Sequence, residues 1–442
     1  MDANVSFFSD LLTSIADRGR ALIGARPARA PAGALIEQCR AVLSGRGEAT
    51  GAARAAEILA GYAGLSSPER SAFFDALAMA FGPDRAAMEA ALARWENGGS
   101  DAAAAALHYA AEPRRLELFR RLNRAPGATR ALVEMRADLL AGAPDPARAT
   151  VDRDLLHLFA SWFNRGFLVL RHIDWATPAN ILEKIIRYEA VHAIHDWDDL
   201  RRRIALPDRR CYAFFHPALV DEPLIFVEVA LTEHTPAAIA PLLADQRPAF
   251  SPERARVATF YSISNCQAGL AGVSFGNFLI KQVVEELRRE SPKLETFVTL
   301  SPAPGLRAWL ESDEAALDEE ARAALLSAQA DSFPESADDR VRKALEPAIA
   351  RYFLRARRPD GRPRDPVARF HLGNGARLER INWLGDLSRK GVADSFGVMV
   401  NYLYDLDAIE TNHEAYADHA VVAASGAVRK ALREKRLRLA AD

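Results

Sequence analysis

A glycine-rich segment is the stretch of this sequence whose residue types first suggest chemistry. It reads QAGLAGVSFG over residues 267–276 and lies between a predicted strand and a predicted helix. The N-terminus of a helix offers unpaired N–H groups, and glycines let the backbone approach an anion closely. The segment lacks the GKS or GKT of a Walker A loop and the spacing of GxGxxG. It predicts either a phosphate cradle built from backbone groups or a tight turn without a ligand.

The same segment contains GVSFG at 272–276, which matches the G-x-S-x-G nucleophile elbow of α/β-hydrolases. Such an elbow requires a strand that leads directly into the serine. Here the predicted strand ends near Ser264, well before Ser274, which argues against a Ser274 nucleophile.

The composition is that of an ordinary globular chain with balanced charge. Among 442 residues, 57 Lys and Arg stand against 59 Asp and Glu, so the formal net charge is −2. This balance argues against a nucleic-acid partner, which needs a basic excess on one face. The three cysteines are far apart and form no CxxC pair, so we expect no disulfide framework, no zinc and a cytoplasmic location. No segment suggests a signal peptide or a membrane span, so we expect no membrane association.

Two regions of different character must position the glycine segment. The first ~160 residues have helical periodicity, as in Phe74, Leu77 and Phe81 after a predicted N-cap at Ser67. We place a domain boundary there, with a helical domain at 1–163 and an α/β domain at 164–442. Predicted strands, an amphipathic helix at 275–290 and a helical, locally acidic stretch at 311–350 lie in the second domain. The strands cover 211–217, 223–231, 256–264, 297–302, 367–383 and 396–406.

Several long, gapless stretches are far more specific than any short motif. They are FYSISNCQAGLAGVSFGNFLIKQVVEELRRESPKLETFVTLSPAPGLRAWL at 260–310, RRCYAFFHP and EPLIFVEVALT upstream, and FHLGNGARLERINWLGDLS and MVNYLY downstream. Together they resemble the malonyl-CoA decarboxylase family. Weaker likeness continues through RADLL (136–140) and SWFNRGFLVL (161–170). The resemblance covers nearly the whole chain and implies an α+β protein. Its all-helical N-terminal domain would serve self-association, and its C-terminal catalytic domain would resemble the GCN5-related acetyltransferase fold.

The family's pattern also implies where CoA binds. A loop that opens a helix holds the CoA pyrophosphate in that fold, in agreement with the phosphate-cradle interpretation of the glycine segment. The implied CoA-binding residues are Ala271, Gly272, Val273, Ser274, Phe275, Gly276 and Asn277. Animal members carry an acidic residue where this chain has Ser274, and a backbone cradle is compatible with that difference.

A catalytic serine and histidine are implied by the same resemblance. The intact motif TLSPAPG places the serine at Ser301, and FHLGNGA places the histidine at His371. Taken alone, a Ser before Pro suits a turn, and a His on an alternating strand suits a structural role. We expect His371 to protonate the enolate carbon and Ser301 to orient the malonyl carboxylate or accept a proton. Asn374 and Tyr404 are secondary candidates for polar contacts with that carboxylate.

The implied reaction converts malonyl-CoA to acetyl-CoA and CO2. It requires that CoA be held, that the enolate oxygen meet donors and that the carbon receive a proton. The thioester is the electron sink, so we expect no metal and no cofactor beyond the CoA of the substrate. A tight Arg clamp on the carboxylate would stabilise the charge that the reaction must disperse.

Other functions remain open at this stage. An acyl-CoA-dependent N-acetyltransferase would have the same fold but a different reaction. A thioesterase would use Ser301 and His371 to hydrolyse the thioester. A helical scaffold that senses acyl-CoA would bind it without catalysis. The expected partners are malonyl-CoA, acetyl-CoA and further copies of this chain in a dimer or tetramer.

Overall fold

The computed structural model describes residues 32–45, 47–248, 250–273, 279–330, 333–334 and 339–432. Ser274, Phe275, Gly276 and Asn277 of the predicted CoA loop lie outside them. The chain forms two compact units. The first contains residues up to Val169 together with Phe215–Leu224 and Gln267–Phe275, and the second contains the rest. Two segments from later in the sequence thus belong to the helical unit, whereas the predicted boundary after residue 163 places them in the second domain.

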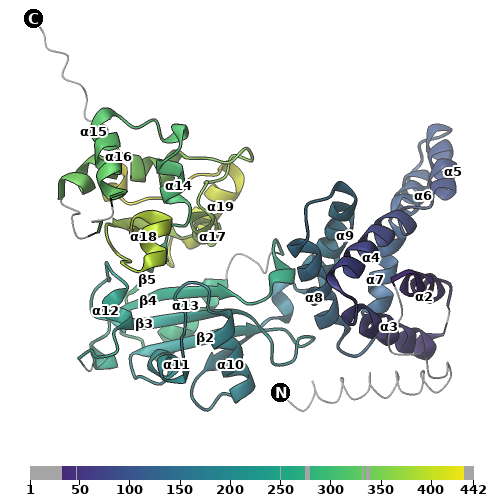
Figure 1. Cartoon of the computed structure of the whole chain (residues 1–442), viewed down its shortest axis with the longest axis horizontal. Coiled ribbons are helices and arrows are strands. Elements are labelled where there is room, and N and C mark those ends of the chain that lie inside the picture. The colour runs from purple at the N-terminus through teal and green to yellow at the C-terminus, as the bar shows by residue number, and fades with distance from the viewer. Residues whose placement is uncertain are drawn as a thin grey trace, which may run out of the picture. The chain divides into compact units, whose positions relative to one another are not determined.

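Helices dominate the first unit (Figure 1). Their bounds are α2 (Ala32–Ser44), α3 (Glu48–Ala63), α4 (Ser67–Ala80), α5 (Arg85–Glu96), α6 (Asp101–Ala111), α7 (Arg114–Leu122), α8 (Ala128–Ala141) and α9 (Pro146–Trp162). Phe74, Leu77 and Phe81 are buried, as their spacing predicts. The predicted N-cap at Ser67 is wrong by one residue. Ser66 caps α4 instead, because Glu69 accepts hydrogen bonds from its N–H and its hydroxyl at 2.8 and 2.7 Å.

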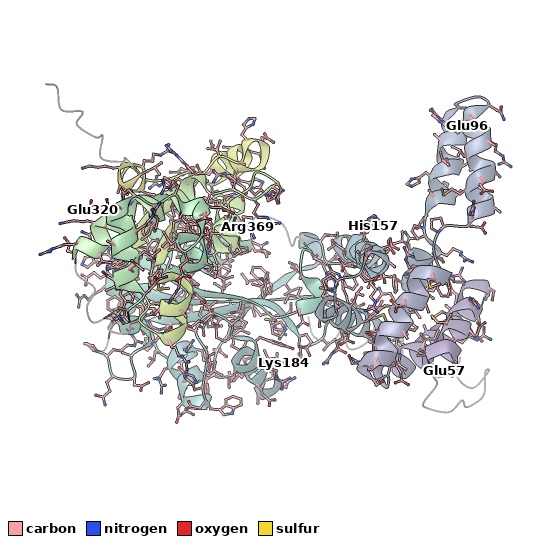
Figure 2. The ribbon with its side chains drawn as sticks, turned by 45° about the horizontal axis from the view of Figure 1, so that its top comes forward. Glu57, Glu96, His157, Lys184, Glu320 and Arg369 are labelled. Atoms are coloured by element: carbon pink, nitrogen blue, oxygen red, sulfur yellow. The ribbon has the colours of Figure 1, made fainter. Side chains whose placement is uncertain are left out.

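Helices α5 and α6 form a hairpin that stands away from the other helices of the unit, with Glu96 at its tip (Figures 1 and 2). Only Ala91 is buried on α5, and no residue is buried on α6. The hairpin therefore contributes little to the core that the other helices build.

A mixed sheet with the strand order β1-β2-β3-β4-β5-β8-β6 organises the second unit, and β7 pairs with β8. The strands are β1 (Val169–Ile173), β2 (Arg209–Phe215), β3 (Pro223–Thr232), β4 (Val257–Asn265), β5 (Thr296–Thr299), β6 (Ser301–Pro302), β7 (Arg377–Asn382) and β8 (Met399–Leu403). β3 and β4 are antiparallel, whereas β4 and β5 are parallel and pair only as far as Phe260 and Thr299. β4 continues for five residues beyond that pair, so its end is free of β5.

The second unit also contains helices. Those of the second unit are α10 (Ala179–Tyr188), α11 (Trp197–Ile204), α12 (Ala240–Leu243), α13 (Leu279–Glu290), α14 (Leu306–Leu310), α15 (Glu319–Ala328), α16 (Asp339–Arg355), α17 (Pro366–Gly373), α18 (Arg389–Ser395), α19 (Ile409–His419) and α20 (Gly426–Ala431). The predicted amphipathic face of α13 is confirmed, because Leu279, Val283 and Leu287 are all buried. No helix within the described ranges has the length and apolar character to cross a membrane.

The predicted strand at 367–383 is wrong in its first half. Residues 366–373 form helix α17, and only Arg377–Asn382 is a strand. Asp365 caps the helix by accepting the N–H of Ala368 at 2.7 Å, and Pro366 occupies its first turn. The Asp-Pro pair is a helix-start signal that outweighs the apparent alternation of the following residues.

Candidate active site

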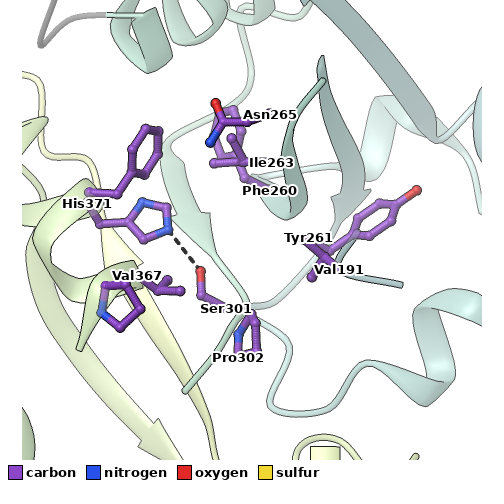
Figure 3. Close-up of a pocket in the computed structure, with 11 residues that line it drawn as sticks. Val191, Phe260, Tyr261, Ile263, Asn265, Ser301, Pro302, Val367 and His371 are labelled. Carbon is purple, nitrogen blue, oxygen red and sulfur yellow. Dashed lines mark hydrogen bonds between the residues drawn. The ribbon is translucent and has the colours of Figure 1, made fainter. Parts of the chain in front are cut away.

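Ser301 and His371, which lie far apart in the sequence, meet in the second unit. Ser301 opens β6, with one residue between it and the end of β5, and His371 lies in the last turn of α17. The Oγ of Ser301 is 3.1 Å from Nε2 of His371 (Figure 3). Both residues are buried. The two residues that the resemblance implies as catalytic are therefore hydrogen-bonded partners.

The contact belongs to a longer line of hydrogen-bonding groups. Nδ1 of His371 is 2.8 Å from the hydroxyl of Tyr404, and Oγ of Ser301 is 2.9 Å from Oγ1 of Thr299. If Ser301 donates to Thr299, Nε2 carries the imidazole proton and Nδ1 accepts from Tyr404. If Ser301 donates to Nε2, Nδ1 carries that proton and donates to Tyr404. The line thus supports either tautomer, which is what a group that receives and delivers a proton requires.

Neighbouring strands fix the two ends of this line. The N–H of Tyr404 donates to the carbonyl of Phe297 on β5 at 2.8 Å, and the N–H of Tyr402 donates to Oγ1 of Thr299 at 3.1 Å. The Tyr402 ring also stacks on the His371 imidazole, with centroids 4.6 Å apart and planes 24° apart. The imidazole therefore has little freedom to rotate away from Ser301.

Burial controls the ionisation of this group. Burial lowers the pKa of His371 to about 3, and it raises the pKa of Tyr404 well above its ordinary value. At neutral pH, both side chains are therefore uncharged. A negative charge that enters its surroundings would favour the cationic form of His371.

A pocket of about 250 Å³ opens on the Ser301–His371 contact. Apolar and aromatic side chains form most of its wall, and Figure 3 shows Ser301 and His371 between them. The lining residues are Val191, Phe260, Tyr261, Ile263, Asn265, Ser301, Pro302, Pro366, Val367, Phe370 and His371. No Lys, Arg, Asp or Glu is among these described lining residues. A carboxylate bound here would lose water without gaining a cationic partner.

The secondary candidates fall in different places. Tyr404 contacts His371 and not the pocket, and Asn374 does not line the pocket either. The Asn374 side chain donates to the carbonyl of Phe370 at 2.8 Å, at the C-terminal end of α17. These positions suit residues that hold His371 and its helix better than residues that bind a substrate carboxylate.

Buried charges behind the pocket are functional candidates that the sequence does not reveal. The Glu189 carboxylate accepts the N–H groups of Val191 and His192 at 2.7 and 2.8 Å, and it also accepts the Ser262 hydroxyl. Arg203 donates to the carbonyls of His192 and Ala193 at 2.7 and 3.0 Å. These bonds fix the segment that carries Val191 into the pocket wall. Composition and spacing cannot locate them, because burial of the charges depends on the tertiary fold.

The described part of the glycine segment belongs to the helical unit. Ala271 and Gly272 are exposed, and Val273 is buried. Gly272 has φ +80°, a left-handed conformation that favours glycine. A Cβ on Gly269 would lie 1.9 Å from the carbonyl oxygen of Val133 on α8, so that glycine is required by packing. Turn geometry and helix packing thus explain two glycines of a segment for which spacing alone left a phosphate cradle and a tight turn both open.

Family models and relatives agree with this architecture. The malonyl-CoA decarboxylase N-terminal domain model matches residues 81–163, and the C-terminal domain model matches residues 166–441. The mitochondrial malonyl-CoA decarboxylase of the goose Anser anser anser is 36% identical over 403 residues, covering 82% of this chain and 80% of that protein.

Solved structures extend the likeness to the fold. The crystal structure of malonyl-CoA decarboxylase from Rhodopseudomonas palustris is 57% identical and has a TM-score of 0.88, covering 91% of this chain and 100% of that one. The structure of the Agrobacterium vitis enzyme is 53% identical, with a TM-score of 0.86 and the same coverage. The expected helical N-terminal region and the α/β unit that follows it are confirmed, and the likeness of that unit to the acetyltransferase fold stays a prediction. The chain belongs to the malonyl-CoA decarboxylase family.

Proposed function

We propose that this protein converts malonyl-CoA to acetyl-CoA and CO2 through an enolate, with Ser301 and His371 as its catalytic pair. Its family makes it a carboxy-lyase, as the sequence predicts. The observation that carries the mechanism is the contact of 3.1 Å between Oγ of Ser301 and Nε2 of His371 on a pocket of largely apolar wall.

The pocket favours loss of the carboxylate. A malonyl carboxylate that enters it leaves water for an apolar wall, and the hydroxyl of Ser301 is one of the few donors it can meet. As CO2 departs, the bond between the carboxyl carbon and the α-carbon breaks. Its electron pair passes into the thioester, and the negative charge spreads over the enolate. A polar but uncharged partner stabilises the spread charge without holding the compact one.

The proton comes from His371 in this mechanism. The substrate carboxylate raises the pKa of the buried imidazole, because an opposite charge favours the cationic form. His371 then takes up a proton from solution, and Nε2 gives it to the α-carbon after CO2 has left. The imidazole returns to its neutral form, which burial favours. The net reaction consumes one proton for each malonyl-CoA, as the balance of charge requires.

The glycine segment binds the CoA portion of the substrate in this proposal. Its members are Ala271, Gly272, Val273, Ser274, Phe275, Gly276 and Asn277, of which the first three are described. The backbone N–H groups of such a loop can hold a diphosphate without a basic side chain. The thioester serves as the electron sink, so the proposal includes no metal and no organic cofactor.

Turnover of malonyl-CoA with no other substrate tests the reaction. A decarboxylase makes acetyl-CoA and CO2, a thioesterase releases free CoA, and an N-acetyltransferase needs an added amine. A sensor would bind CoA without turnover. Any of the last three results would contradict the proposal.

Variants of the pair test the mechanism. We expect Ser301→Ala and His371→Asn each to lose about two orders of magnitude or more in kcat, the usual contribution of a positioned acid–base group. Ser395→Ala is a matched control, since among the described residues that buried hydroxyl bonds only to the carbonyls of Gly391 and Val398. Near-full rates in folded Ser301→Ala and His371→Asn would remove both residues from the mechanism.

We further propose that the helical unit associates with other copies of the chain in a dimer or tetramer. Met88, Leu92 and Trp95 lie at i, i+4 and i+7 on α5, and each is at least 40% exposed. An apolar stripe on a protruding hairpin supports such a contact. Light scattering of Leu92→Glu and Trp95→Glu tests it, and an unchanged mass would contradict a role for this face. The cytoplasmic location stays a prediction.

A further inference from the structure

A buried arginine of the helical unit holds the glycine segment. Arg136 lies on α8, and only 2% of it is exposed. Its Nη1 donates to the carbonyl oxygens of Gly269 and Ala271 at 2.7 and 2.8 Å. Its Nε donates to Oδ1 of Asp152 on α9 at 2.7 Å. Charge-assisted bonds from a planar guanidinium fix the direction of their acceptors more firmly than neutral bonds do.

The loop lies directly against α8 at the same place. Gly269 packs so closely on the backbone of Val133 that no side chain fits between them. Val133 and Arg136 are three residues apart, so they share a face of the helix. One helix face therefore provides both the surface under the loop and the cation that binds its carbonyls.

This arrangement sets the direction of a loop N–H group. In a trans peptide, the C=O and the following N–H point in opposite directions. Because the carbonyl of Ala271 points to Arg136, the N–H of Gly272 points away from it. Gly272 is exposed, and the part of the chain that the structure describes offers its N–H no acceptor. The free donor thus faces outward, where an anionic ligand can reach it.

We propose that Arg136 is a positioning residue for CoA, and that the helical unit supplies the base of the CoA-binding loop. This inference rests on the proposed role of the loop in binding the CoA diphosphate. Arg136 does not touch the ligand in this scheme. It orients the carbonyls of Gly269 and Ala271 inward so that N–H groups of the loop remain available to the diphosphate.

The test compares a substrate that has the diphosphate with one that lacks it. Arg136→Met should raise KM for malonyl-CoA by about tenfold or more, as the loss of charge-assisted bonds from an organised loop implies. The kcat value should change little. Malonyl-N-acetylcysteamine carries the same thioester without the nucleotide, and its kcat/KM should be unaffected. A general loss of structure would instead lower kcat/KM for both substrates.

Arg115→Met is the matched control. Arg115 is also buried in the same unit, and it bonds to Asp154 at 2.6 Å and to the carbonyl of Ala78 at 3.1 Å, whereas among the described residues it makes no hydrogen bond to the loop. We expect it to lower the unfolding temperature and to leave KM for malonyl-CoA unchanged. If Arg136→Met does not fold, Asp152→Asn carries the same test, because it loosens the guanidinium and should raise KM by a smaller factor.

Three outcomes would overturn the inference. They are an unchanged KM in Arg136→Met, an equal loss with both substrates, and an equal rise of KM in Arg115→Met. Calorimetric binding of CoA itself compares the same variants without turnover. A wild-type chain that binds CoA but decarboxylates neither thioester would refute the proposed reaction, while weaker CoA binding in Arg136→Met would still support the role of Arg136.

Discussion

Replacing Tyr404 with phenylalanine removes one hydroxyl from the line that supports His371. The hydroxyl is 2.8 Å from Nδ1 of His371. The ring centroids of Tyr404 and Phe260 are 6.2 Å apart, and a phenylalanine at position 404 can keep that ring contact. The buried Nδ1 then has no partner on that side. The tautomer that places the proton on Nδ1 loses its acceptor, and the imidazolium loses one of its two partners.

The expected effect follows from the cost of an unmade buried hydrogen bond. That cost is about 1–3 kcal/mol, and more when the group is charged. The deficit is greatest when the imidazole is cationic, so it falls on the proton-transfer step. We therefore expect kcat to fall by about 10- to 100-fold. KM for malonyl-CoA should stay near the wild-type value, because Tyr404 does not line the pocket.

Tyr402→Phe is the internal control. Tyr402 lies two residues earlier on β8, is fully buried and stacks on the same imidazole, but its hydroxyl has no hydrogen-bond partner among the described residues. Removing that hydroxyl keeps the stacking and should leave kcat within about twofold. Initial rates of acetyl-CoA formation measure both variants. Equal rates in the two variants, or full activity in Tyr404→Phe, would refute the idea that Tyr404 supports a proton on His371.

Three further outcomes are expected. Binding of malonyl-CoA, but not of acetyl-CoA, should be accompanied by uptake of a proton, because the carboxylate raises the pKa of His371. Calorimetry of the inactive variant Ser301→Ala in buffers of different ionisation enthalpy measures this uptake. The absence of proton uptake would contradict the mechanism. Burial raises the pKa of Glu228 from 4.5 to about 8, so the folded chain keeps a proton that the unfolded chain releases and stability should fall as the pH rises from 4.5 to 8. Urea unfolding of Glu228→Gln should show a shallower fall, and an identical pH profile would argue against that ionisation. Asp365→Ala removes the cap of α17, and it should lower stability by about 1–2 kcal/mol and reduce kcat, whereas Asp365→Asn should retain the cap and most of the activity.

The family resemblance implied Ser301 and His371 as a pair, but the residue pattern did not predict the element that carries the histidine. The motifs around Ser301 and His371 identify two residues whose contact at 3.1 Å is then found in the structure. The residues after Pro366 alternate enough to resemble a strand, and yet the Asp-Pro start makes them helical. A local capping interaction therefore decided a case in which the pattern of apolar residues was ambiguous.

Tertiary contacts account for what the sequence did not reveal. Tyr404 reaches His371 because β8 pairs with β5 and α17 packs beside them, and no spacing within one segment encodes that meeting. The same holds for Gly269, whose role depends on the backbone of Val133. A glycine count near a predicted helix start cannot separate close packing from anion binding, since both need the absence of a side chain.

The absence of a cationic side chain among the described pocket residues affects both the substrate carboxylate and His371. An arginine beside Ser301 would bind malonyl-CoA more tightly, but it would stabilise the compact carboxylate more than the dispersed charge of the enolate and so slow the reaction. The same arginine would oppose protonation of His371. In the proposed mechanism, the charge of the substrate carboxylate instead promotes proton uptake by His371. As CO2 leaves, the pKa of His371 returns toward the low value that burial sets. A lysine or arginine introduced at Val367, in the pocket wall, should therefore lower KM and kcat together.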